Sequence, residues 1–270
     1  MIYMALYERS DYTANISYLH NTLIYELDIH KANISILLSK GLISQNLYAA
    51  LYNAERTKRQ VFIGRLQKNP SIALALKEGI KEAKRFLIET NNIQDFEILS
   101  IKNDAVYVIG RMPQITKFGL IDFRCKNVYT GFYKVQNLEL YYLYNTIDKS
   151  ENLSVKGIND DKLVQHNDYM IRYLKDLFYT IQCEGIEQAI RLHKKFYLKY
   201  INRDLDIQFY RRFRSTSDYY LAVTTQTGVG FSTENDYMPE LVDISHNLGI
   251  LIDLQKILNS IYFTRCSPRP

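Results

Sequence analysis

A change in hydrophobic periodicity constrains the fold of this chain more than any other feature. Residues 44–90 space their apolar side chains at roughly helical intervals, which is typical of amphipathic helices. The segments FEILSIK and AVYVIGR that follow are apolar, β-branched stretches, and these favour paired strands. From residue 162 a helical period returns. This order predicts an α+β fold, with an antiparallel sheet that carries helices on one face and a mostly helical part after it.

Boundary signals place the individual elements. LIYELDI (23–29) is bounded by polar residues and predicts a buried strand, and a short helix is expected from Ala32 to Gly41. Ser44 can cap one long helix ending at Asn69, and Pro70 precedes or opens the next. Further strands are expected at 118–124, 129–135, 138–144 and 153–158, a hairpin at 219–231 and a last helix after Pro239. Two domains are predicted, 1–158, including helices at about 42–90, and 159–270.

Composition and charge narrow the class of protein. Three widely spaced cysteines without a CxxC pair favour reduced thiols and exclude a disulfide framework. The N-terminus lacks a signal-peptide pattern, and no apolar run is long enough to span a membrane, so we expect a cytoplasmic protein without a membrane partner. The net charge is +5, and Lys and Arg gather in segments 56–89, 111–134 and 191–214. Such clusters favour a phosphate-lined partner, although each alone also fits a solvated helix face.

Two acidic residues mark candidate chemistry. Asp28 lies near the end of an apolar strand, and Asp104 lies in the turn of SIKNDAVYV. Phosphoryl transfer needs divalent metals that neutralise charge on the attacking and leaving oxygens, and Mg²⁺ typically takes only one or two protein carboxylates. Two acids at adjacent strand ends meet this requirement, while Asn-Asp is also ordinary turn chemistry.

The order of motifs in residues 23–158 resembles the catalytic half of family B DNA polymerases. YELDIHKANISIL looks like the first palm motif and SIKNDAVYV like the second. RTKRQVFIG (56–64) looks like the fingers motif, KNVY (126–129) like an element that contacts duplex DNA, and VKGI (155–158) like the start of the thumb. The first predicted domain then corresponds to a palm with short fingers-like helices, and the second to a thumb.

The resemblance implies a set of site residues and ligands. Two Mg²⁺ ions would be held by Asp28 and Asp104, which are also the catalytic residues. The substrates would be nucleoside triphosphates and a DNA primer–template, with other polymerase or replication subunits as further partners. The implied nucleotide-binding residues are Arg56, Lys58, Arg59, Gln60 and Gly64, and the implied nucleic-acid contacts are Lys126, Tyr129, Lys156, Lys194, Lys195, Arg211 and Arg212.

The chain also departs from the family pattern. Lys102 occupies the first Asp position of the second palm motif, and Ile63 replaces the fingers Tyr. The chain leaves no room for an exonuclease domain before the palm. Two interpretations stay open: a reduced polymerase of phage or mobile-element type, or one subunit of a split enzyme, and alternatively an inactive palm that binds nucleic acid or serves as a scaffold.

Overall fold

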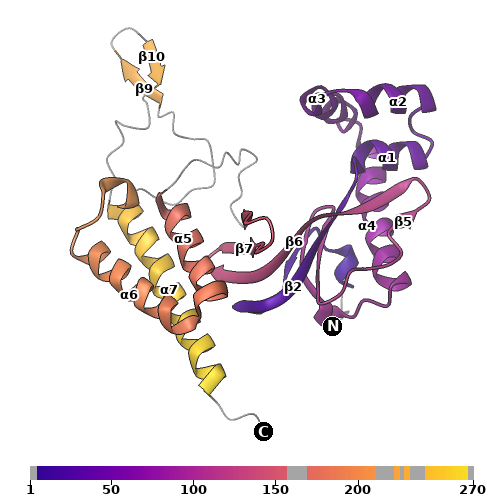
Figure 1. Ribbon diagram of the computed structural model, residues 1–270. Helices are drawn as coiled ribbons and strands as arrows, with labels where there is room; N and C mark the ends of the chain where they lie inside the picture. Colours follow the sequence, from indigo (N-terminus) through magenta and orange to yellow (C-terminus); the bar gives the residue numbers. More distant parts are fainter. Residues whose placement is uncertain (1–4, 157–168, 211–221, 226–227, 232–240, 267–270) are drawn as a thin grey trace. The chain divides into compact units, whose positions relative to one another are not determined.

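The computed structural model describes residues 5–156, 169–210, 222–225, 228–231 and 241–266 (Figure 1). The chain divides into two compact units. Unit 1 holds residues 1–16 and 22–129, and unit 2 holds residues 17–21 and 130–270. The predicted α+β class with an antiparallel sheet is confirmed. No helix among the described residues is long and apolar enough to cross a membrane.

Unit 1 is built around antiparallel strands in the order β1-β3-β4-β2-β6, with β5 paired to β6. The hairpin predicted around Asn103-Asp104 is formed by β3 and β4, and Asn103 takes a positive φ of 54° in its turn. Strand β6 replaces the two shorter strands expected at 118–124 and 129–135. The elements are η1 (Leu6–Glu8), β1 (Asp11–Thr13), β2 (Tyr18–Ile29), α1 (Ala32–Ser39), α2 (Gln45–Asn53), α3 (Arg56–Leu66), α4 (Pro70–Thr90), η2 (Asp95–Glu97), β3 (Ile98–Lys102), β4 (Ala105–Ile109), β5 (Lys117–Phe118) and β6 (Ile121–Val135).

The single helix expected after Ser44 is two helices. The Ser44 side chain caps α2 as predicted and accepts a hydrogen bond from the Leu47 amide. The chain then breaks, because Ala54 and Glu55 both take extended ψ angles of 150° and 148°. A new helix, α3, begins at Arg56, so its basic face is set independently of α2.

Alternation along the strands separates two faces of the unit 1 sheet. Leu27 and Ile29 of β2 lie in one core with Val106 and Val108 of β4, and residues of helices α1 and α4 join that core together with residues of α2, α3, β3 and β6. The intervening residues of β2, Glu26 and Asp28, therefore point to the opposite face. The expectation of helices on one face holds for the core of this unit, and Asp28 points away from that core.

Helices α1 and α4 pack closely at a glycine (Figure 1). A Cβ atom built on Gly79 of α4 would lie 2.3 Å from Cγ2 of Ile36 on α1. We expect Gly79→Ala to destabilise the protein by about 1–3 kcal/mol, because the packed helices would have to separate. The matched control is Gly64→Ala on α3, where nothing lies within 4 Å of the added carbon. That change should stabilise by up to about 1 kcal/mol. Urea denaturation of both variants measures this, and equal effects would contradict the packing.

Unit 2 combines strands with three long helices. The C-terminal part of β6 pairs with β7, and β7 pairs with β8, in agreement with the strands expected at 138–144 and 153–158. Within the hairpin predicted at 219–231, β9 and β10 pair antiparallel, and residues 219–221 and 226–227 lie outside the described residues. The elements are β7 (Leu138–Tyr144), β8 (Glu151–Lys156), α5 (Tyr169–Tyr179), η3 (Thr180–Glu184), α6 (Ile186–Ile201), η4 (Ile207–Tyr210), β9 (Ala222–Thr225), β10 (Gly228–Phe231) and α7 (Leu241–Cys266).

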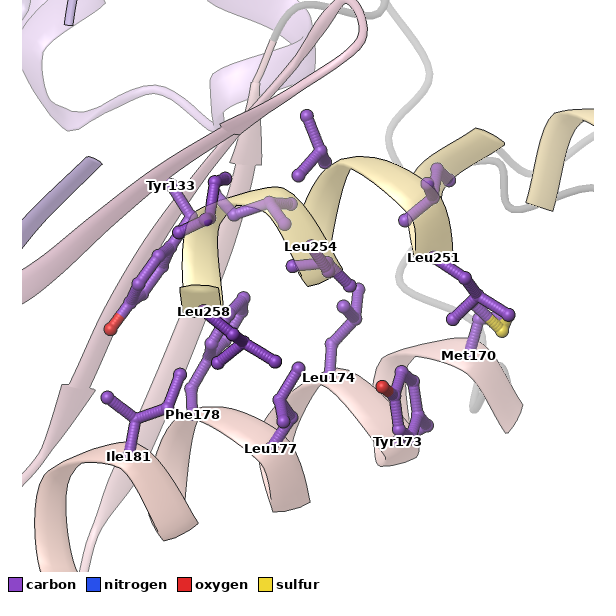
Figure 2. Packing of buried hydrophobic residues seen from close by; sticks show 14 of the residues in the cluster. Tyr133, Met170, Tyr173, Leu174, Leu177, Phe178, Ile181, Leu251, Leu254 and Leu258 are labelled. Carbon is purple, nitrogen blue, oxygen red and sulfur yellow. The ribbon is translucent and has the colours of Figure 1, made fainter. Parts of the chain in front are cut away.

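The core of unit 2 explains where the units divide. Figure 2 shows Leu251, Leu254 and Leu258 of α7 facing Leu174 and Phe178 of α5. The Tyr133 ring stacks on Phe178 with centroids 4.3 Å apart. Inward residues of β7 and β8 join the same core. These two strands therefore belong with the C-terminal helices, and the division falls at residue 129 instead of the expected 158.

Candidate functional site

Sheet register brings the two predicted acids to one place. Asp28 near the end of β2 lies directly opposite Ala105, the first residue of β4, and Asp104 immediately precedes Ala105. The end of one strand and the tip of the neighbouring hairpin thus converge, although the two acids are far apart in sequence. Both acids line a single pocket of about 400 Å³.

The pKa of Asp104 depends on its burial and on the charge of Asp28. The pKa of Asp104 is raised to about 6, chiefly by burial and in part by the negative charge of Asp28. A hydrogen bond from its own backbone and the charges of Lys126 and Lys84 act in the opposite direction. A perturbed carboxyl group in a pocket is a feature typical of functional sites. At neutral pH this site holds concentrated negative charge that would favour a cation.

One face of α3 supplies positive charge to the same pocket. Arg56, Arg59 and Gln60 line it together with Ile63, a spacing that places all four on one side of the helix. Arg59 is held in place, since its Nη1 donates to the Ala54 carbonyl at 3.1 Å. The helix break before Arg56 therefore fixes the direction of this basic face.

The N-terminus of α1 forms another wall of the pocket. Residues 30–34 line it, and they include the first turn of α1, whose amide groups lack carbonyl partners within the helix. Lys31 enters this turn in a left-handed conformation, with φ 50° and ψ 44°. Its ammonium group lies over the Tyr52 ring and donates to the Tyr52 carbonyl. Such a helix start attracts anions, phosphate groups above all.

Lys126 reaches the pocket from β6, beside a buried carboxylate. Glu26 is only 2% exposed, and its oxygens accept hydrogen bonds from the hydroxyls of Tyr107 and Tyr129, both at 2.9 Å. Asn127 donates to the same carboxylate at 2.6 Å, and Lys126 Nζ lies 3.8 Å from it. Glu26 thus anchors the β6 segment that carries Lys126. Tyr129 is fully buried in this network, so it is no surface contact for nucleic acid.

Several predicted residues lie outside the pocket. Lys58 is exposed and lies 3.6 Å from Glu55, and Gly64 is exposed on α3 without lining the pocket. The unit 2 residues Lys194 and Lys195 are exposed on α6, and Lys156 is half-buried at the end of β8. Arg211 and Arg212 lie outside the described residues.

Lys102, which takes the place of an acid in the expected motif, has its own structural role. Its Nζ donates to Asp11 Oδ1 at 2.7 Å and to Thr13 Oγ1 at 3.1 Å, so it ties β3 to β1. Across the sheet, Ala105 separates Lys102 from Asp28. Lys102 therefore forms a cross-strand ion pair with Asp11, and Asp28 and Asp104 are the acidic residues that line the pocket.

Sequence reasoning missed His30, Asn33 and Glu26. His30 lines the pocket beside Asp28, its Nε2 lies 3.3 Å from the Tyr52 hydroxyl, and burial and the charges of Arg124 and Lys31 lower its pKa. Asn33 lines the pocket from the first turn of α1. A signal existed for Glu26, because strand alternation places it on the same face as Asp28.

Among the residues that the structure describes, no three His, Cys, Asp or Glu side chains group to hold a metal ion. The donor set at the pocket is thus the pair Asp28 and Asp104. Two carboxylates suit Mg²⁺, which keeps several waters and takes substrate phosphate oxygens as further ligands. They would not suffice for a structural zinc site, which needs four closed positions.

Comparison with protein families places the whole chain. The model of the family described as "Bacteriophage PBS1 gene 130 protein" matches residues 1–260, which include all of unit 1, every residue of the pocket and unit 2 as far as residue 260. The chain belongs to this phage protein family. Among curated proteins, the comparison found no match. The family assignment shows that this is a phage protein.

Proposed function

We propose that this phage family member performs template-directed nucleotidyl transfer as the palm and thumb part of a family B-like DNA polymerase. The observation that carries the proposal is the joint pocket: Asp28 and Asp104 line it together with Arg56, Arg59 and the N-terminus of α1. Paired acids opposite a basic helix face and a helix N-terminus form the environment that a metal-bound nucleoside triphosphate needs.

Magnesium fits this donor set. Asp28 and Asp104 would hold it, and when bound it supplies charge neutralisation at the attacking and leaving oxygens. In the reaction, the primer 3′ oxygen forms a bond to the α-phosphorus, and the bond between that phosphorus and the bridging oxygen breaks. Pyrophosphate leaves, and the hydroxyl proton passes to solvent or a nearby base.

The remaining pocket residues position the triphosphate. Arg56 and Arg59 present planar guanidinium groups that pair with phosphate oxygens in two-pronged fashion. Residues of the first turn of α1 line the same pocket, and their backbone amides would add donors without a mobile side chain. Lys126, anchored beside Glu26, adds a positive charge near the two acids. In unit 2, the basic face of α6 would contact the backbone of the primer–template without reading its sequence.

Primer extension by the purified chain tests the proposal. With a primer–template, deoxynucleoside triphosphates and Mg²⁺, we expect template-dependent extension that stops when Mg²⁺ is chelated. A second candidate is a palm that binds nucleic acid without copying it. Lys102 motivates this candidate, because family B DNA polymerases have an acid at the matching position of their second palm motif. Salt-sensitive binding without any incorporation would favour that second candidate over the first.

Arg56 and Lys58 offer a matched pair on one helix. We expect Arg56→Gln to raise the KM for the incoming nucleotide about tenfold or more, since hydrogen bonds to charged groups are worth roughly 1.5–3 kcal/mol. Lys58→Gln removes the same charge on a side chain that does not line the pocket, and it should leave KM unchanged. Steady-state kinetics of single-nucleotide incorporation measures both. Equal effects of the two substitutions would contradict the assigned direction of the basic face.

A further inference from the structure

A second cavity in unit 1 lies beside the candidate site and has no role in the proposed transfer. It encloses about 650 Å³ between α4, α1 and the segment that joins η1 to β1. Asn33 lines both cavities, and Asn103 lines the second one next to Asp104. The two cavities therefore adjoin at the first turn of α1 and the hairpin tip.

The wall of this second cavity is basic. Lys77, Lys81 and Lys84 of α4 follow one another at positions i, i+4 and i+7, so all three lie on one helix face. Arg9, in the segment between η1 and β1, also lines the cavity. We call these four residues the basic pocket.

The acids near the basic pocket are partly neutralised already. Glu8 and Asp11 also line the cavity, but Asp11 accepts a hydrogen bond from Lys102 at 2.7 Å. Lys81 pairs with Glu78 of its own helix at 2.9 Å. Within the described part of the chain, neither Lys77 nor Arg9 forms an ion pair with a carboxylate. The cavity thus keeps an excess of positive charge.

Two of the four cations, Arg9 and Lys84, have buried nitrogen atoms or side chains. Arg9 Nε is buried and has no hydrogen-bond acceptor among the described residues. Lys84 is 1% exposed, and its ammonium group donates to the Arg9 carbonyl. Burial lowers the pKa of Lys84 to about 8, with Asp104 acting in the opposite direction, so the group is mostly protonated at pH 7. The Arg9 guanidinium also lies over the Tyr12 ring, with Cζ 5.5 Å from the ring centroid. Burying positive charge is costly, and a bound anion would offset the part of that cost that Tyr12 and Asp104 leave.

We propose that the basic pocket binds a phosphate-bearing anion, with the pyrophosphate released by nucleotidyl transfer as the favoured source. The choice of pyrophosphate rests on the proposed function, because the cavity adjoins the site where that product forms. Binding of phosphate chemistry itself does not depend on catalysis. A nucleic-acid backbone carries the same chemistry and is the other source that the experiment distinguishes.

Isothermal titration of the full chain with inorganic pyrophosphate, and separately with a single-stranded oligothymidylate, tests this proposal. Lys77→Glu alters an exposed cation of the basic pocket. Its control, Arg85→Glu, makes the same charge change on an exposed residue of α4 that does not line the cavity. We expect Lys77→Glu to weaken pyrophosphate binding about tenfold, and Arg85→Glu to leave it near the wild-type value.

Arg9→Gln supplies an independent second variant, and Arg56→Gln separates binding at the candidate site from binding at the basic pocket. Weakening of oligothymidylate binding alone would assign the pocket to a nucleic-acid backbone and retain the phosphate chemistry. Unchanged binding of both probes by Lys77→Glu and Arg9→Gln would overturn the proposal. A chain that binds pyrophosphate through these residues but extends no primer would reject the proposed function and leave the anion site standing.

Discussion

We expect Asp28→Asn and Asp104→Asn each to lower the proposed nucleotide incorporation by about a thousandfold. Each change would remove a carboxylate that would hold Mg²⁺, and with it several kcal/mol of transition-state stabilisation. The two acids line one pocket, and the charge of one raises the pKa of the other. The double variant should therefore be little worse than either single variant, since both act on the same ions. Single-turnover primer extension measures the loss.

The control for this experiment is Asp95→Asn. Asp95 is exposed in η2 of the same unit and does not line the pocket. It should retain wild-type rates, which separates loss of the site from a general loss of negative charge. Retained activity in both Asp28→Asn and Asp104→Asn would remove these residues from the reaction.

Asp104→Asn should at the same time stabilise the metal-free protein above pH 6. The folded protein raises the pKa of this carboxyl from 3.8 to about 6, so the native state binds more protons than the unfolded state between these values. Stability contributed by this group is therefore lost as the pH rises from about 4 to about 6. A neutral amide avoids the loss, and the gain at pH 8 reaches at most roughly 3 kcal/mol.

Urea denaturation at pH 5 and pH 8, with and without Mg²⁺, measures this effect. The gain from Asp104→Asn should be larger at pH 8 than at pH 5, and Mg²⁺ should stabilise the wild type but not the variant. Asp148 is the opposite control, because hydrogen bonds from Ser150 lower its pKa, so Asp148→Asn should give no gain. If Asp104→Asn destabilises the protein at pH 8, the predicted cost of ionising Asp104 beside Asp28 in the folded protein is contradicted.

Strong local signals made much of the fold predictable. The hairpin around Asn103-Asp104 and strand β7 follow from apolar runs bounded by turn residues. The break at Ala54 and Glu55 was not predictable, because neither residue interrupts helices by propensity and the apolar period continues across it. The division of the compact units at residue 129 has no local sequence signal, since the packing of β7 and β8 on distant helices leaves no trace in local sequence.

The candidate site was predictable in its acids and less so in its surroundings. Asp28 and Asp104 were found from motif order, and strand register explains why they meet. Tyr129 was expected on the surface because its motif contacts DNA in the resembling family, but its hydroxyl is bound to the buried Glu26. The role of Glu26 depends on partners from two other strands, β4 and β6, which no linear spacing reveals.

Crystals of the protein soaked with Mn²⁺ and a deoxynucleoside triphosphate would test the shared acids most directly. Mn²⁺ takes oxygen ligands similar to those of Mg²⁺ and is visible by its anomalous scattering. We expect an anomalous peak coordinated by carboxylate oxygens of both Asp28 and Asp104, with the triphosphate extending toward Arg56. Nucleotide and metal bound elsewhere, with the two carboxylates contacting no ion, would contradict the account.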